Sequence, residues 1–225
     1  MELNSVKIHQ NYEKILENVK KYSPYPEKVK ILFVSKYLNV EEHKAVIDMG
    51  YDYFGENRAQ LYRDKLNEFS DEKYKNIKWD FIGRWQKNKI KYTIDSYQLL
   101  EEINKKAIEN NKTISGLIQI NVSREESKTG VYIEDFKKDS EKYFSMSNVK
   151  IAGFMTMAPF VEDEETLRSC FRKLRELRDE IKGLCLEYAP CKFLSMGMSN
   201  DYEIAIEEGA THIRIGTALV GNELK

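Results

Sequence analysis

Short apolar runs alternate with amphipathic segments along most of the chain, and this alternation is its most regular pattern. The run from Ile31 to Val34 is too short for a helix and lacks helical spacing, so it predicts a strand buried on both faces. Similar runs recur to the end of the sequence. The predicted strands cover residues 31–35, 51–54, 79–82, 93–95, 116–122, 151–157, 193–196 and 212–215.

Helices are predicted before the first strand and between the later ones. In residues 3–22 the apolar positions fall on one helical face, and Ser23-Pro24 ends the segment. The longest predicted helix, about 163–187, is charged on one face and carries an apolar stripe on the other. Further helices are predicted over about 40–49, 61–69, 86–91, 99–108, 133–145 and 200–208.

Strands that alternate with helices indicate parallel pairing through right-handed crossovers. Eight such units fit an α/β fold with a single (β/α)8 TIM barrel and an extra N-terminal helix. The strand at 93–95 is the weakest of the eight, and without it an open doubly wound sheet is the alternative. No Pro/Gly-rich linker or shift in composition divides the sequence, so we expect residues 1–225 to form one domain.

Composition and charge narrow the range of functions. The sequence is 41% hydrophobic and 32% charged, which is typical of a globular protein with a substantial core. Its 36 basic and 37 acidic residues give a formal net charge of -1, which argues against a nucleic-acid surface. Lys87, Lys89 and Lys91 do not form a single helical stripe, so we interpret them as solvated.

Three cysteines, Cys170, Cys185 and Cys191, form no CxxC pair and predict unpaired thiols in a reducing compartment. The residues after Met1 contain no apolar core of a secretory signal. No apolar run approaches the ~18 residues that a membrane span needs. We therefore expect a cytoplasmic protein without a membrane partner.

Candidate chemistry collects at the carboxyl ends of the strands, which meet on one face of a barrel. Lys36 follows the strand at 31–35 and is expected on this face, whereas Lys30 precedes the strand and is expected on the opposite one. The alternative interpretation of Lys36 is a solvated lysine at a strand end.

Two glycine turns on the same face predict a phosphate site. Gly197-Met198-Ser199 and Gly216-Thr217 follow the last two strands, whose loops often bind phosphate together in barrels. Such turns expose backbone N–H groups beside a helix N-terminus. The alternative for Ser199 is a plain N-cap of the following helix.

Arg214 lies inside the last predicted strand, where a guanidinium needs an acceptor. The acceptor could be a carboxylate elsewhere in the barrel or an atom of a ligand. A lysine amine, a phosphate cradle and an arginine on one face suit a phosphorylated aldehyde held as a Schiff base.

Eight short motifs then occur in order. Together they resemble the YggS/PROSC family of pyridoxal 5'-phosphate (PLP) homeostasis proteins, from about residue 30 to 221. The combination is highly specific, although no single motif is. The motifs are Val-Ser-Lys at 34–36, Phe-Gly-Glu-Asn at 54–57, Trp-Asp-Phe-Ile-Gly at 79–83, Gln-x-Asn-Lys at 86–89, Ser-Lys-Thr-Gly at 127–130, Gly-Phe-Met-Thr-Met at 153–157, Leu-Ser-Met-Gly-Met-Ser at 194–199 and Arg-Ile-Gly-Thr at 214–217.

The resemblance implies a fold-type III barrel like the barrel domain of alanine racemase, with PLP held as a Schiff base on Lys36. It implies phosphate contacts from Ser199, Gly216 and Thr217. It also implies that Arg214 pairs with the pyridine nitrogen and keeps it unprotonated, which weakens the ring as an electron sink.

Other positions are implied less directly. Asn57 is implied to lie beside the ring, and Met157 and Met198 to line the pocket, although methionines inside a barrel also serve as filler. Arg84 and Trp85 depart from the family pattern and are expected to change the rim after the third strand. The sequence stops just after the last strand, so the closing helix is expected to be short or absent.

Three functions remain open. The first is a non-catalytic PLP binder that buffers the cofactor or delivers it to apo PLP-dependent enzymes, acting as a monomer. The second is a small amino-acid racemase, which needs an acid or base on each face of the cofactor. The third is a sugar-phosphate enzyme with Lys36 as its Schiff base. His9 and His43 fall on predicted outer helices and His212 on the opposite end of the barrel, so we identify no second base and favour the first.

Overall fold

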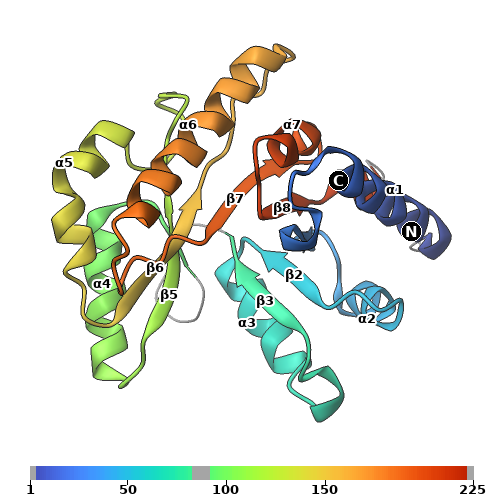
Figure 1. Cartoon of the computed structure of the whole chain (residues 1–225). Helices are drawn as coiled ribbons and strands as arrows, with labels where there is room; N and C mark the ends of the chain where they lie inside the picture. Colours follow the sequence, from blue (N-terminus) through green and yellow to red (C-terminus); the bar gives the residue numbers. More distant parts are fainter. Residues whose placement is uncertain (1–3, 83–91, 222–225) are drawn as a thin grey trace.

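Eight parallel strands form one curved sheet with helices around its outside (Figure 1). The structure is a computed structural model and describes residues 4–82 and 92–221. The strands are β1 (Lys30–Val34), β2 (Tyr53–Glu56), β3 (Lys78–Phe81), β4 (Tyr92–Ile94), β5 (Ile114–Gln119), β6 (Val149–Met155), β7 (Phe193–Met198) and β8 (His212–Ile215).

The strand order is that of a barrel. It runs β3-β2-β1-β8-β7-β6-β5-β4, so sequence neighbours stay adjacent and the first strand pairs with the last. A doubly wound sheet instead reverses its order at a switch point and leaves its first and last strands apart. The TIM-barrel prediction is therefore confirmed and the doubly wound alternative is wrong. The weakly patterned strand β4 is present and pairs with β5 from Tyr92 to Ile94.

The helices agree with the predicted amphipathic segments. They are α1 (Ser5–Tyr22), α2 (Val40–Asp48), α3 (Ala59–Glu68), α4 (Tyr97–Glu109), α5 (Ile133–Phe144), α6 (Glu164–Gly183), α7 (Tyr202–Glu207) and α8 (Thr217–Val220), with 3-10 turns η1 (Pro26–Lys28) and η2 (Glu72–Tyr74). The helix predicted at 86–91 lies outside the described residues. None of the helices in the described ranges is long and apolar enough to cross a membrane.

The extra N-terminal helix is confirmed and packs where the two ends of the chain meet. The Asn11 side chain donates to the carbonyl of Leu219 at 2.8 Å, and that of Asn18 donates to the hydroxyl of Tyr202 at 2.8 Å. Helix α1 therefore covers the C-terminal helices next to β1 and β8 (Figure 1). The assignment of residues 1–225 to one domain stays a prediction.

Several strand boundaries, among them those of β2, β6 and β7, differ from their predictions, and the end of β5 differs most. The strand predicted at 116–122 is β5 at Ile114–Gln119, because Ile120 keeps one bond to the end of β6 and the chain then pairs with the loop residue Val131. The amide of Asn121 donates to the carbonyl of Val131 at 2.9 Å, and the amide of Val131 donates to Gln119 at 2.9 Å. An apolar run cannot show which backbone partner it has, so its end was placed too late.

A buried histidine lies in the outer layer, between α2 and the sheet. The ring of His43 is fully buried and contacts the rings of Phe54, Phe69 and Trp79, with centroids 4.5 to 5.4 Å apart. Neither ring nitrogen has a hydrogen-bond partner in the described part of the chain. Burial, assisted by the nearby charge of Lys65, lowers the pKa of His43 from its ordinary 6.5 to about 3.

This histidine predicts a loss of stability in mild acid. The unfolded chain protonates His43 below about pH 6.5 while the folded chain does not, so the contribution is fully present above that pH and is lost as the pH falls toward 3. At pH 5 the free energy of unfolding should be about 2 kcal/mol lower than at pH 8 from this residue alone. Urea titrations of wild type and His43→Phe at both pH values measure it. An equal pH dependence in the two proteins would contradict the assignment.

Candidate functional site

The carboxyl ends of four adjacent strands form the candidate site. The order β2-β1-β8-β7 brings together turns that lie far apart in the sequence. Val34 pairs with Gly55, and Phe33 pairs with Ile215, so the turns after β1, β2 and β8 are neighbours. The sequence prediction that Lys36, Asn57 and Gly216 share one end of the barrel follows from this register.

Lys36 lies half-buried in the turn directly after β1. Its Nζ is 4.7 Å from the ring centroid of Tyr37, and it forms no ion pair with any residue in the described ranges. The turn is held to β2, because the amide and the hydroxyl of Ser35 both donate to the carbonyl of Gly55, at 3.0 and 3.3 Å. The Lys36 amine therefore lies on a turn that is hydrogen-bonded to β2, and no carboxylate among the described residues pairs with it.

Asn57 follows β2 on the neighbouring turn and is also half-buried. Its Oδ1 atom is buried and has no hydrogen-bond partner within the described residues. Buried polar atoms of this kind are rare in folded proteins, and one explanation is a ligand that completes them. Asn57 is thus placed to accept a hydrogen bond from a molecule bound beside Lys36.

The two glycine turns after β7 and β8 meet as predicted. The hydroxyl oxygen of Ser199 accepts from the amides of Gly216 at 3.3 Å and Ala218 at 3.1 Å. The N-cap of the following helix α7 is Asp201, so the interpretation of Ser199 as that cap is wrong. Thr217 lies half-buried at the same turn. Hydroxyls and loop amides gathered in this way are suited to a phosphate group.

The strand predicted at 193–196 extends to Met198, so Gly197 lies within β7 and allows the end of this strand to lie directly on helix α7. Its φ of +91° is in the left-handed region, and a Cβ there would come within 2.6 Å of the Ala205 Cβ and 3.0 Å of the Tyr202 Cα. The amide of Met198 next donates to Oδ1 of Asp201 at 2.5 Å. Burial raises the pKa of that carboxyl, which the charge of Arg214 opposes in part.

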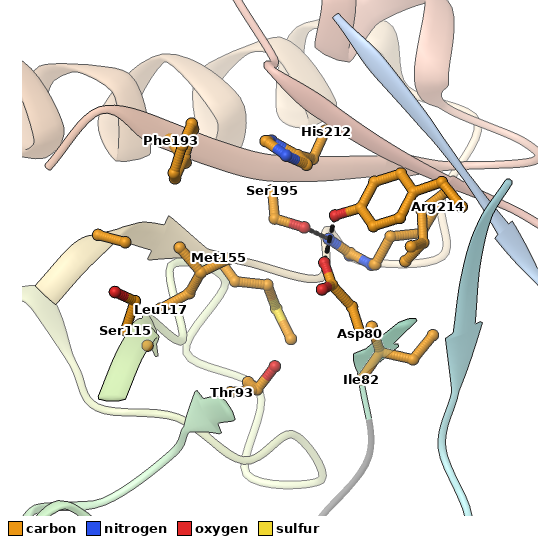
Figure 2. A pocket seen from close by; sticks show the side chains of 14 residues that line it. Asp80, Ile82, Thr93, Ser115, Leu117, Met155, Phe193, Ser195, His212 and Arg214 are labelled. Carbon is orange, nitrogen blue, oxygen red and sulfur yellow. Dashed lines mark hydrogen bonds between the residues drawn. The ribbon is translucent and has the colours of Figure 1, made fainter. Parts of the chain in front are cut away.

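Arg214 points into the barrel interior and is 5% exposed (Figure 2). Its guanidinium donates to the hydroxyl of Ser195 and to the carbonyl of Thr156, each at 2.8 Å. Burial lowers the pKa of Arg214 to about 10, so the group stays charged at neutral pH. Neither hydrogen-bond acceptor is a carboxylate, so the alternative of a hydrogen-bonded carboxylate partner does not hold among the described residues; the Asp201 carboxylate acts on Arg214 only through its charge.

A cavity of about 110 Å³ lies in the barrel interior on the amino-end side of Arg214 (Figure 2). Its walls include apolar side chains such as Leu117 and Met155. At its polar edge the hydroxyl of Tyr53 donates to the carboxylate of Asp80. Arg214 therefore forms one wall of this cavity.

The two predicted methionines lie at the same end of the barrel. Met157 is half-buried just after β6, and Met198 is 37% exposed at the end of β7. Their lining of a ligand pocket stays a prediction. Arg84 and Trp85, which were expected to shape the rim after β3, lie outside the described residues.

Sequence reasoning missed three polar residues that hold the site together. Thr156 and Ser195 fix Arg214, and Asp201 fixes the turn after β7. Thr156 and Ser195 are inside the quoted motifs, so the motifs could have nominated them. Their role was hidden because a sequence does not show which side chain a buried arginine reaches.

Comparison with known proteins gives consistent matches along the chain. A family model described as "Alanine racemase, N-terminal domain" matches residues 73–223. A protein of Aquifex aeolicus named "Pyridoxal phosphate homeostasis protein" is 43% identical over 202 residues, which cover 85% of this chain and 86% of that protein. A protein of the same name from Vibrio alginolyticus is 33% identical and covers 95% of this chain and 97% of its own length.

Solved structures agree with this fold. PipY of Synechococcus elongatus PCC7942, solved with PLP bound, matches with a TM-score of 0.77 and 28% identity, over 92% of this chain and all of that one (100%). Alanine racemase of Corynebacterium glutamicum matches with a TM-score of 0.69 at 14% identity, over 97% of this chain and 61% of the racemase. The racemase likeness shows the fold alone.

Gly197→Ala should destabilise the protein by ~1–3 kcal/mol, because alanine at this φ is strained and its Cβ meets helix α7. Gly183→Ala is the matched control, since Gly183 ends α6 and a Cβ there has no neighbour within 4 Å. Chemical denaturation of both variants measures the difference. A Gly197→Ala protein as stable as wild type would show that the turn is not tightly packed.

Proposed function

This chain belongs to the family of pyridoxal phosphate homeostasis proteins, and on that premise we propose that it binds PLP at the carboxyl end of its barrel and holds it as a Schiff base on Lys36. The observation that carries the proposal is the half-buried Lys36 amine, which has no ion pair among the described residues. The turns of Ser199 and Gly216 lie on the same end of the barrel. The named relatives and the PLP-bound PipY structure support the choice of cofactor.

The phosphate end fits the turns after β7 and β8. The Ser199 hydroxyl already accepts two backbone N–H groups, so its own hydrogen can donate to a phosphate oxygen. Thr217 supplies a second hydroxyl and Gly216 a close backbone approach. The buried positive charge of Arg214 adds electrostatic attraction from the barrel interior.

Lys36 supplies the covalent attachment. The Lys36 amine would hold the aldehyde group of bound PLP as a C=N bond in place of the C=O bond, with the carbonyl oxygen released as water. No oxidant or reductant is consumed. The reaction is reversible, which suits a protein that stores a reactive aldehyde and releases it.

The ring end fits Arg214, Asn57 and the two methionines. A guanidinium has only donors, so Arg214 facing the pyridine nitrogen would keep that nitrogen unprotonated. PLP bound in this way supplies an electrophilic imine but a weak electron sink. Asn57 offers its Oδ1 beside the ring, and Met157 and Met198 offer apolar contacts.

The placement of the histidines and of Tyr37 supports a non-catalytic role. A racemase needs a proton donor or acceptor on each face of the cofactor. His43 is buried in an aromatic cluster, His9 bonds the Tyr51 hydroxyl on the outer layer, and His212 starts β8 at the opposite end. Tyr37 lies against the Lys36 amine itself. We propose that the protein buffers PLP in the cytoplasm as a monomer and delivers it to apo forms of PLP-dependent enzymes.

Absorbance spectra of the purified protein with PLP test the attachment. Wild type should show a band near ~420 nm that borohydride removes by reduction, and Lys36→Ala should show none. Lys30→Ala is the matched control, because Lys30 is an exposed lysine at the other end of the same strand. It should behave as wild type.

Two results would redirect the assignment. A wild-type spectrum without the band would contradict the proposed Schiff base on Lys36. Steady interconversion of D- and L-amino acids by the loaded wild type, lost in Lys36→Ala, would replace the carrier role with that of a small racemase.

A further inference from the structure

A buried ion pair lies beneath the turns that carry Lys36 and Asn57. Glu56 ends β2 and Lys65 lies in α3, and their side chains are 0% and 4% exposed. The Lys65 Nζ and the Glu56 Oε2 are 2.8 Å apart. Aromatic side chains such as Phe54 and Phe69 are buried in the same part of the fold.

Each end of the pair also binds backbone at the site. The Lys65 ammonium donates to the carbonyl of Ser35 at 2.8 Å, one peptide bond before Lys36. The Glu56 Oε1 accepts from the amides of Asn57 at 2.8 Å and Arg58 at 3.1 Å. The pair thus connects three segments: the end of β1, the end of β2 and the helix α3.

The energetics of a buried ion pair favour a role in fixing the geometry of the two turns over a role in stabilising the fold. Removing two charges from water costs several kcal/mol per ion, and a well-packed apolar pair of the same volume is often as stable or more so. What only the ion pair provides is a set of directed hydrogen bonds to the two turns. Without Lys65 the Ser35 carbonyl keeps only the amide of Leu38, at 3.1 Å, which closes the turn but does not tie it to α3.

We propose that Lys65 and Glu56 are positioning residues, which hold the turns of Lys36 and Asn57 in one fixed relation so that both face the same ligand. The proposal rests on the proposed function, since the ligand in question is PLP. On this proposal helix α3, which lies outside the site, orients the Lys36 amine through Lys65. It differs from a purely structural role because it predicts a defect confined to the two turns.

The test uses the double variant Glu56→Gln/Lys65→Met, which removes both charges together and leaves neither one buried alone. The control is Arg175→Met/Glu208→Gln on the outer face of α6 and α7, where a buried carboxylate pairs with an arginine at 2.8 Å. Both proteins are compared with wild type in thermal melting. Hydrogen–deuterium exchange without ligand and the rate of Schiff-base formation with PLP, followed by absorbance, are measured on all three.

The double variant should form the Schiff base about tenfold to a hundredfold more slowly than wild type, as expected for a misplaced reacting group. Its amides at 35–38 and 56–58 should exchange faster, while the rest of the sheet exchanges as in wild type. The control should melt earlier without either change. If the double variant does not fold, Glu56→Gln/Lys65→Gln, which also leaves no charge buried alone and keeps polar groups at both positions, should show the same changes to a smaller extent.

Unchanged exchange at the two turns together with unchanged Schiff-base formation would overturn the proposal and leave the pair a structural role only. A wild type that forms no Schiff base would instead refute the proposed function. In that case the hydrogen–deuterium exchange still shows whether Lys65 and Glu56 hold the two turns in place, because it is measured without ligand.

Discussion

The pairing of the first strand with the last is the interaction on which the site depends. β1 and β8 align from Lys30 opposite His212 to Phe33 opposite Ile215, and this register sets the turn of Lys36 beside the turn of Gly216. A slip of one residue would send every side chain of a strand to the other face. The amine and the phosphate turns therefore come together only if the barrel joins its two ends in this register.

The second constraint is a buried guanidinium whose hydrogen-bond acceptors within the described residues are both neutral. Arg214 stays protonated at neutral pH although burial lowers its pKa to about 10, and its two acceptors, Ser195 and Thr156, are neutral. A buried positive charge attracts an anionic ligand bound nearby. In the proposed site the same charge would face the pyridine nitrogen, which favours holding a cofactor over using it as an electron sink.

The alternation of apolar runs and amphipathic segments predicted the barrel because both patterns report burial directly. Even β4 was found from three residues, since the repeat required a strand there. The partners of Arg214 and the role of Lys65 could not be predicted, because they depend on side-chain directions between segments distant in sequence. His43 was placed on an outer helix correctly, but its burial among three aromatic rings required the packing of α2 on the sheet.

Peptide mapping of the borohydride-reduced, PLP-loaded protein by mass spectrometry tests the central claim most directly. The account predicts a pyridoxyl group on the peptide that contains Lys36, in an amount that matches the bound cofactor. No other lysine should be labelled to that extent. Modification chiefly at another lysine, or none after reduction, would contradict the assignment of Lys36 and of the barrel end that it occupies.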